Sequence, residues 1–184
     1  EKYVLIAPLR SGRPHQAAVP SDACPLIRPE DSPFSPHNIN NEQPLAIVGS
    51  KRRWKVYVVR NKFPAVSLDN PKAYGEHEVV IETPNPNIHL EDLPTNHVAD
   101  ILYIYAQRTA ALTKNPRLHY VLIFKNSGGR AGASLCHAHS QIFATEFIPP
   151  HILDKSTRTQ AYRAKYGTCI YCQVIIREHR SRRF

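Results

Sequence analysis

The chain has 184 residues, is 42% hydrophobic and carries a formal net charge of +9. This length can bury one good core, which corresponds to one domain and the beginning of another. No apolar run approaches the length of a transmembrane helix and the first residues lack a leader pattern, so we expect a cytoplasmic protein without a membrane partner. The basic residues concentrate at residues 51–55, which have the pattern of a charged turn into a strand, and near the C-terminus. No basic face with interleaved aromatic residues appears elsewhere, which disfavours a nucleic-acid partner but permits a phosphate-bearing substrate.

The N-terminal part of the sequence predicts one short strand and then a long irregular segment. Residues 3–7 have the composition of a strand, and the turn after them carries Arg10 and Arg13, which spacing alone does not rank. Between Pro14 and Pro44 seven prolines interrupt every period, so this segment should wrap the sheet rather than join it. The four Cys residues of the chain are too dispersed for a disulfide framework.

Two strands and one helix are predicted in the middle of the chain. The segments 54–60 and 75–82 alternate with the period of a strand. Asn61 follows the first segment, where an Asn is typical of a turn that ends a strand, and His77 in the second is expected to be structural. Residues 95–115 predict the one clear helix, whose apolar stripe should pack on the sheet. The stripe consists of Val98, Ile101, Leu102, Tyr105 and Leu112.

The stretch from residue 120 to residue 145 carries the candidate chemistry. An apolar strand at 120–124 ends before a glycine-rich loop, whose backbone N–H groups can approach an anionic ligand beside Arg130. A second strand is predicted at 134–145, and its period of two places three polar side chains on one face. These side chains are His137, His139 and Gln141.

Two imidazoles and an amide in a row on a buried strand have to be hydrogen-bonded, bound to metal or used on a ligand. Imidazole is often uncharged near neutral pH, so a His held against a phosphate can act as a nucleophile. A lone His-x-His pair is more often half of a zinc site than a catalytic pair. Spacing alone therefore leaves both interpretations open.

The complete string of residues is more specific than its parts. At fixed distances it contains Asn126, a glycine-rich turn, Gly132-Ala133-Ser134 and His137-Ala138-His139-Ser140-Gln141. This string resembles the histidine-triad superfamily, and Gln141, where the hydrolases usually carry a third His, makes it similar to the galactose-1-phosphate uridylyltransferase family. Ala138 departs from the Pro that is usual there. Further motifs of this family are Arg10-x-x-Arg13-Pro14, Asn61-x-Phe63-Pro64-Ala65 and the strand entered at Gly75.

The resemblance implies an α+β fold, with a mainly antiparallel sheet and a central helix packed on one face. It implies an enzyme of galactose metabolism that moves a UMP group between a UDP-hexose, such as UDP-glucose, and a hexose 1-phosphate. His139 would attack the α-phosphorus and hold the nucleotidyl group, and a homodimer is expected because such sites draw residues from a partner subunit. Further implied roles are phosphoryl-oxygen contacts from Arg13, Ser134 and Gln141 and nucleoside contacts from Asn61 and Asn126.

The resemblance also concerns zinc. The family binds zinc through a Cys-x-x-Cys pair, a His after the third strand and the first His of the His-x-His pair. Cys24 and His137 keep two of these ligands, but Ile27 replaces the second Cys. Neither Pro86 nor Asn87 supplies the missing His. Because two ligands cannot make a tetrahedral site, we expect no complete zinc site there. The possible substitutes are His37 and His89.

A second zinc site is predicted at Cys169 and Cys172, which have the spacing of a zinc knuckle. Its other ligands are expected beyond Phe184. In the family a second, similar half begins at such a pair. We therefore assign residues 1–166 to an N-terminal histidine-triad-like catalytic domain and residues 167–184 to the start of a second domain, within a longer working protein.

Two alternatives remain open at this point. The first is an adenylyl-transferring phosphorylase of the same superfamily, acting on ADP-sugars or dinucleoside polyphosphates, because no residue of the sequence identifies the base. The second is a nucleotide-binding module without turnover, which the incomplete zinc site and Ala138 favour.

Overall fold

A computed structural model describes residues 4–12 and 24–181 of the chain. The described residues divide into two compact units, a larger one within Leu5–Phe147 and a smaller one that contains Val4 and begins again at Ile148. The larger unit holds the whole sheet and every candidate chemical residue from Asn61 to Gln141.

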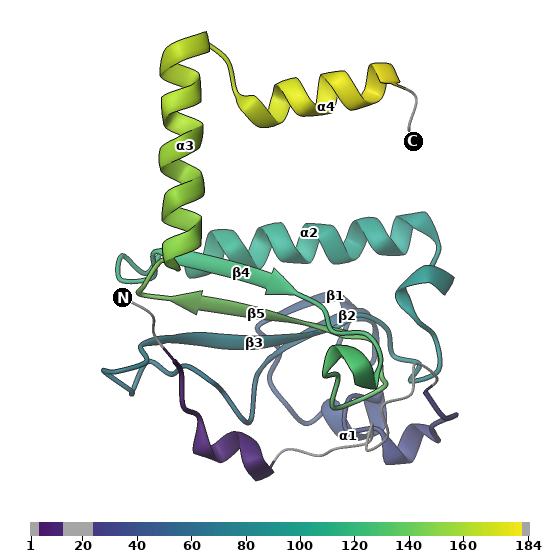
Figure 1. Cartoon of the computed structure of the whole chain (residues 1–184). Helices are drawn as coiled ribbons and strands as arrows, with labels where there is room; N and C mark the ends of the chain where they lie inside the picture. The colour runs from purple at the N-terminus through teal and green to yellow at the C-terminus, as the bar shows by residue number, and fades with distance from the viewer. Residues whose placement is uncertain (1–3, 13–23, 182–184) are drawn as a thin grey trace. The chain divides into compact units, whose positions relative to one another are not determined.

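The larger unit is built on a five-stranded sheet (Figure 1). Its strands lie in the order β1-β2-β3-β5-β4, and all neighbouring pairs are antiparallel. The strands are β1 (Ala46–Ser50), β2 (Arg53–Arg60), β3 (Gly75–Ile81), β4 (Tyr120–Phe124) and β5 (His139–Thr145). This arrangement confirms the predicted α+β fold with a mainly antiparallel sheet.

One face of the sheet is covered by helix α2 (Thr95–Leu112) (Figure 1). Alternate strand residues point into this core, where β-branched side chains of three strands meet the helix. Its buried members are Val56, Val58, Val80, Ile101, Ile104, Leu112, Leu118, Ile142 and Ala144. Burying this apolar surface is the main stabilising contribution to the larger unit.

The opposite face of the sheet is covered by the segment that precedes β1. This segment contains the short helices η2 (Pro29–Asp31) and α1 (Pro36–Ile39). A second core lies beneath it and includes Trp54, Tyr57 and Ile81. The described part of the Pro-rich segment therefore wraps the sheet as predicted. His139 and Gln141 belong to this face, since they alternate along β5 with the helix-facing Ser140 and Ile142.

The predicted helix stripe is correct except at one position. Leu102 is 58% exposed, whereas Ile104 is buried. The buried side of α2 continues through Arg108, whose Nε and Nη2 donate to the two carboxylate oxygens of the fully buried Glu78 at 2.9 and 2.6 Å. Because the charged Arg108 lies on the buried side of the helix, the apolar pattern alone included Leu102 in the stripe and left out Ile104.

One predicted strand is absent from the described residues, and another is shorter than the sequence suggested. Residues 4–7 form no strand and lead into η1 (Pro8–Gly12). Strand β5 begins only at His139, because residues 134–138 form an irregular approach to the sheet after η4 (Gly129–Ala131). His137 therefore lies just before the strand rather than on it, although its ring is still buried.

The smaller unit consists of two helices, α3 (Pro150–Tyr166) and α4 (Ile170–Ser181). Gly167 ends α3 with φ of 71°, a left-handed conformation that glycine adopts without steric cost, and its N–H donates to the carbonyl of Arg163. The boundary between the two compact units lies between Phe147 and Ile148, so α3 belongs to the same unit as α4. In the described part of the chain, no helix combines the length and apolar character needed to cross a membrane.

Candidate active site

The ring of His139 is held by a bond to the backbone two residues earlier. Its Nδ1 lies 2.8 Å from the carbonyl oxygen of His137. A carbonyl can only accept, so Nδ1 carries the proton and Nε2 keeps the lone pair of the neutral ring. Burial lowers the pKa of His139 and the charge of Lys125 adds to this effect, while the bond to His137 and the charge of Glu82 oppose it. A neutral ring with a defined nucleophilic nitrogen results.

A buried carboxylate lies on the helix side of β5, next to His139. Glu82 is fully buried, and its Oε2 accepts from Nζ of Lys125 at 2.6 Å. Its Oε1 accepts from the hydroxyl of Ser140 and, at 3.3 Å, from that of Tyr105. Every oxygen of this carboxylate has a partner, as a buried charge requires. The network ties α2 and β4 to the residue that follows His139.

His137 is buried with both ring nitrogens in hydrogen bonds. Its Nε2 donates to the carbonyl oxygen of Thr83 at 2.7 Å, and its Nδ1 accepts from the hydroxyl of Ser32 at 2.7 Å. Burial lowers the pKa of His137 to about 4. This ring is therefore neutral and anchored, and its backbone oxygen is the group that orients His139.

A second chain of hydrogen bonds orients Gln141. Nδ1 of His77 accepts from the backbone N–H of Ala65 at 3.2 Å, so the ring proton is on Nε2, which donates to Oε1 of Gln141 at 2.9 Å. Burial lowers the pKa of His77 to about 3. Since the amide oxygen of Gln141 is engaged, its N–H groups are the part of the side chain that can donate to a ligand. Asn61 contacts the same His77 nitrogen at 3.0 Å.

A cavity of about 370 Å³ opens on this face of the sheet. Its volume lies in the range of small-molecule sites. Aromatic and aliphatic side chains line it, among them Phe34, Phe63 and Phe124, together with the cation of Arg10. The predicted site residues that line this cavity are Asn61, Asn126, Ser134, His139 and Gln141.

A smaller, polar cavity of about 100 Å³ lies on another side of His139. It is lined by Lys125, the loop residues Asn126 to Gly128, and His89. Asn126, Leu135 and His139 border both cavities, so His139 lies between a mainly apolar cavity and a polar one.

Sequence reasoning missed the residues that support the site. Glu82 and Lys125 gave no periodic signal, because each stands at the end of an apolar strand where a charged residue is ordinary. A carboxylate directly after a fully apolar strand end and a Lys directly before Asn126 were the available signs. Arg13, the predicted phosphate contact, lies outside the described residues.

The sequence profile described as the galactose-1-phosphate uridyl transferase N-terminal domain matches residues 56–149, which is about half of the chain and includes His137, His139 and Gln141. The chain belongs to this uridyl transferase family. The match confirms the resemblance carried by the His-x-His-x-Gln string.

Two relatives show how far the similarity to this family extends. ADP-glucose phosphorylase of Arabidopsis thaliana is 30% identical over 94% of the chain and 54% of its own length. Galactose-1-phosphate uridylyltransferase of Thermotoga maritima is 26% identical over 77% of the chain and 49% of its own length. The crystal structure of an Arabidopsis thaliana ADP-glucose phosphorylase with bound ADP-glucose superposes with a TM-score of 0.72, at 30% identity, over 91% of the chain and 53% of that structure. The chain thus spans about half the length of the curated relatives it matches.

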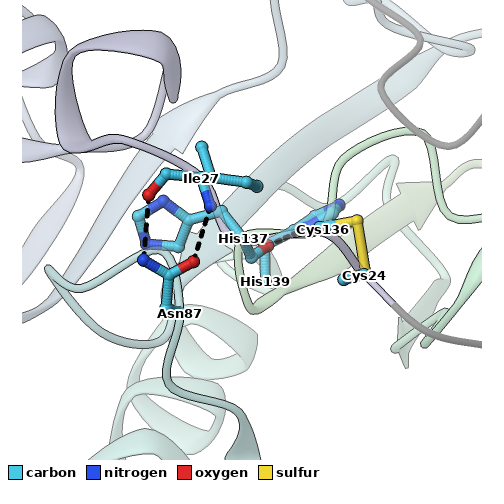
Figure 2. Close-up of a disulfide and its surroundings, with 6 residues drawn as sticks. All are labelled: Cys24, Ile27, Asn87, Cys136, His137 and His139. Carbon is cyan, nitrogen blue, oxygen red and sulfur yellow. Dashed lines mark hydrogen bonds between the residues drawn. A yellow bond between two sulfur atoms is a disulfide. The ribbon is translucent and has the colours of Figure 1, made fainter.

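The N-terminal zinc site expected of the uridyl transferase family does not fit the residues present. Cys24 and Cys136 form a disulfide with Cα atoms 5.7 Å apart, so Cys24 has no thiolate to offer (Figure 2). Both ring nitrogens of His137 are already bonded to protein groups. The disulfide also corrects the expectation from the dispersed cysteines, because the Pro-rich segment brings together residues that lie 112 positions apart.

The C-terminal pair offers a partial fit to zinc. Cys169 and Cys172 are free thiols at the first turn of α4. The backbone N–H groups of Cys172 and Tyr171 lower the pKa of Cys169, which favours the thiolate that a metal needs. Within residues 4–12 and 24–181, no group of three or more His, Cys, Asp or Glu is placed to hold a metal. The pair therefore supplies two sulfur ligands, and a tetrahedral site needs two more.

Proposed function

We propose that this chain carries a nucleotidyl-transfer site that moves a UMP group between a UDP-hexose and a hexose 1-phosphate through a nucleotidyl-His139 intermediate. The observation that carries the proposal is the bond from Nδ1 of His139 to the carbonyl of His137. It leaves Nε2 as the nucleophilic nitrogen of a neutral ring that lines a cavity of substrate size.

The reaction then has two matching steps. In the first, the lone pair of Nε2 of His139 attacks the α-phosphorus, an N–P bond forms, and the bond to the bridging oxygen breaks so that hexose 1-phosphate leaves with the electron pair. In the second, a phosphate oxygen of the acceptor attacks the same phosphorus and His139 leaves. The ring becomes positively charged while it holds the nucleotidyl group, and the carbonyl of His137 stabilises its N–H.

Polar groups beside His139 are suited to the charge that develops on phosphorus. The amide N–H groups of Gln141 and the hydroxyl of Ser134 border the same cavity as His139 and can donate to non-bridging oxygens. Arg13 would add a cation, by analogy with the family. Asn61 and Asn126, with the aromatic lining, would hold the nucleoside.

A second candidate is adenylyl transfer from an ADP-sugar or a dinucleoside polyphosphate. The specific observation in its favour is the 30% identity to ADP-glucose phosphorylase over 94% of the chain. The same nucleophile and donors serve both reactions, because they act on the α-phosphate and not on the base. A nucleotide-binding module without turnover is the third possibility, which the experiment below also separates.

The family suggests three further properties that we propose for the whole protein. Cys169 and Cys172 would hold a structural zinc together with ligands outside the described residues, at the start of a second domain. The exposed apolar side chains of α4, such as Val174, Ile175 and Ile176, would pack against that domain. A homodimer and a cytoplasmic location are proposed by analogy with the family.

Mass spectrometry of the intact protein after incubation with UDP-glucose or ADP-glucose tests these possibilities. A uridylylated protein supports the first proposal, an adenylylated protein supports the second, and binding without either adduct supports the module. Tandem mass spectrometry should place the adduct on His139. An adduct on any other residue would contradict the mechanism.

A further inference from the structure

The place where the family has its first zinc is filled here by protein contacts (Figure 2). The resemblance expects four ligands: at Cys24, at residue 27, at residue 86 or 87, and at His137. In this chain each of the four is engaged with another protein group. These contacts hold together the same chain segments that a zinc ion at this place would hold.

Asn87 and Ile27 join two segments that lie sixty positions apart in the sequence. Oδ1 of Asn87 accepts from the backbone N–H of Ile27 at 2.8 Å, and Nδ2 of Asn87 donates to the backbone carbonyl of Ile27 at 2.8 Å. An amide side chain that bonds both polar groups of one residue fixes distance and orientation together. Figure 2 shows this pair of bonds beside the ring of His137. We call it the Asn87 clamp.

The same two segments also hold His137 between them. Ser32, which bonds Nδ1 of His137, belongs to the segment of Ile27, whereas Thr83, which bonds Nε2, lies in the loop that contains Asn87. The Asn87 clamp and the His137 ring therefore tie the same segments at two points. The Cys24–Cys136 disulfide adds a third tie, at the residue directly before His137.

The backbone of His137 passes this restraint to the reacting group. Its carbonyl oxygen is the acceptor that fixes Nδ1 of His139. If the two segments separated, the ring of His137 would lose its hydrogen bonds to Ser32 and Thr83. The backbone carbonyl of His137 would then no longer be held in position to accept from Nδ1 of His139. In metal sites, outer residues orient a His ligand by the same kind of bond to its second nitrogen.

We propose that the Asn87 clamp, with the Ser32–His137–Thr83 bonds, positions His139 without any metal at this site. Asn87 is a positioning residue that acts through His137, and it touches no reacting atom. The kinetic test of this inference rests on the proposed function, because it measures formation of the nucleotidyl adduct. Its metal test is independent of any activity.

Zinc content tests the metal-free part in the full-length protein. Elemental analysis should find the same zinc per chain in the unmodified protein and in Cys24→Ser, whatever zinc is bound elsewhere. By contrast, the Ile27→Cys/Asn87→His/Cys136→Ser variant, which restores a full ligand set, should gain about one zinc per chain. Loss of zinc in Cys24→Ser would overturn the proposal.

Single-turnover formation of the nucleotidyl adduct tests the positioning part. Asn87→Ala should slow adduct formation by about 10–100-fold, the usual cost of losing an outer orienting residue. Asn115→Ala is the matched control, since the Asn115 side chain also makes two bonds, to Tyr74 and to the backbone N–H of Arg117, but contacts no residue of the His139 site. Asn87→Asp, which places a carboxylate oxygen against the backbone carbonyl of Ile27, should slow adduct formation at least as much as Asn87→Ala.

Zinc dependence separates positioning from simple destabilisation. The variant with the restored ligand set should form the adduct faster with zinc than with a chelator, and faster with zinc than Asn87→Ala. Equal rates for Asn87→Ala and Asn115→Ala would overturn the proposal, even if the restored variant fails to fold. Absence of any adduct in the unmodified protein would instead contradict the proposed function, and the zinc measurement would still decide the metal-free site.

Discussion

The two His residues of the His-x-His string have different tasks because their ring nitrogens have different partners. His137 uses both nitrogens on Ser32 and Thr83, which leaves neither for a ligand. Among the described residues, His139 has a hydrogen-bond partner at Nδ1 alone, the carbonyl of His137. A sequence period cannot distinguish two rings of the same kind, so this difference appears only in the folded chain.

Replacing His139 by Asn should abolish the nucleotidyl adduct and leave the fold intact. Asn has no nucleophilic nitrogen, and His139 lies at the border of two cavities rather than within a packed core. The mass of the intact protein reports whether the adduct forms, and thermal denaturation reports whether the fold is intact. His137→Asn is the comparison: we expect it to lower stability, because the buried Ser32 and Thr83 groups lose their partner. A normal adduct in His139→Asn would refute the mechanism.

Replacing Gln141 by Ala should slow adduct formation by about 10²–10³-fold, the typical cost of removing one preorganised donor to a developing oxyanion. The change also leaves Nε2–H of His77 without its acceptor, so some stability should be lost as well. Stopped-flow or quenched measurement of a single turnover, with substrate saturating, separates the rate from binding. Full turnover in Gln141→Ala would show that this side chain only packs.

At the scale of elements, the pairing of β3 with β5 assembles the site. Val79 pairs with Gln141 and Ile81 pairs with His139, while His77 from β3 contacts Phe143 at a ring distance of 4.0 Å. A slip of one residue would turn His139 and Gln141 to the helix side of the sheet. The register is fixed by the buried apolar side chains on both faces.

Gly75→Ala is a sharp test of this pairing. A Cβ at Gly75 would overlap the backbone oxygen of Ala144 on β5 and would come within 2.8 Å of the Val66 side chain. Such overpacking typically costs about 1–3 kcal/mol in stability. Gly12→Ala is the control, because its nearest neighbour is Phe63 at an ordinary 3.9 Å. Chemical denaturation should show the loss for Gly75→Ala alone; equal stability of the two variants would contradict the close approach of the strands.

Periodicity and composition placed two strands and the central helix correctly, although both faces of the two strands are buried. Strands β2 and β3 and helix α2 were placed from sequence because their apolar residues recur with the period of the element. The start of β5 was placed five residues too early, since residues 134–138 are buried by the wrapping segment and not by sheet pairing. Burial of that kind leaves the same apolar signal as a strand.

Sequence reasoning named residues that line one cavity, but it did not find the hydrogen bonds that connect them. The string from Asn126 to Gln141 and the Asn61 motif identified five side chains that line one cavity. Contacts over long sequence distances escaped prediction, such as Ser32 with His137, His77 with Gln141 and Ile27 with Asn87. Each depends on how a loop is folded over the sheet, which no local pattern records.

At the scale of the whole molecule, the buried His residues make stability depend on pH. The pKa of His137 falls from its ordinary value of 6.5 to about 4 on folding, and that of His77 falls to about 3, in both cases mainly through burial. Between these values and 6.5 the unfolded chain binds protons that the folded chain does not. The free energy of unfolding therefore decreases as the pH falls through this window. Above pH 6.5 the two His residues no longer lower it, because they are neutral in both the folded and the unfolded chain.

For His137 alone the expected loss is about 3 kcal/mol across the window from pH 6.5 to about pH 4. Urea denaturation at a series of pH values measures it. His137→Gln removes the titrating group, so its stability should be lower at neutral pH but should depend less on pH between these limits. If the two proteins lose stability in parallel on acidification, His137 is not held in its neutral form by the fold, and its assignment as a buried anchor for His139 is wrong.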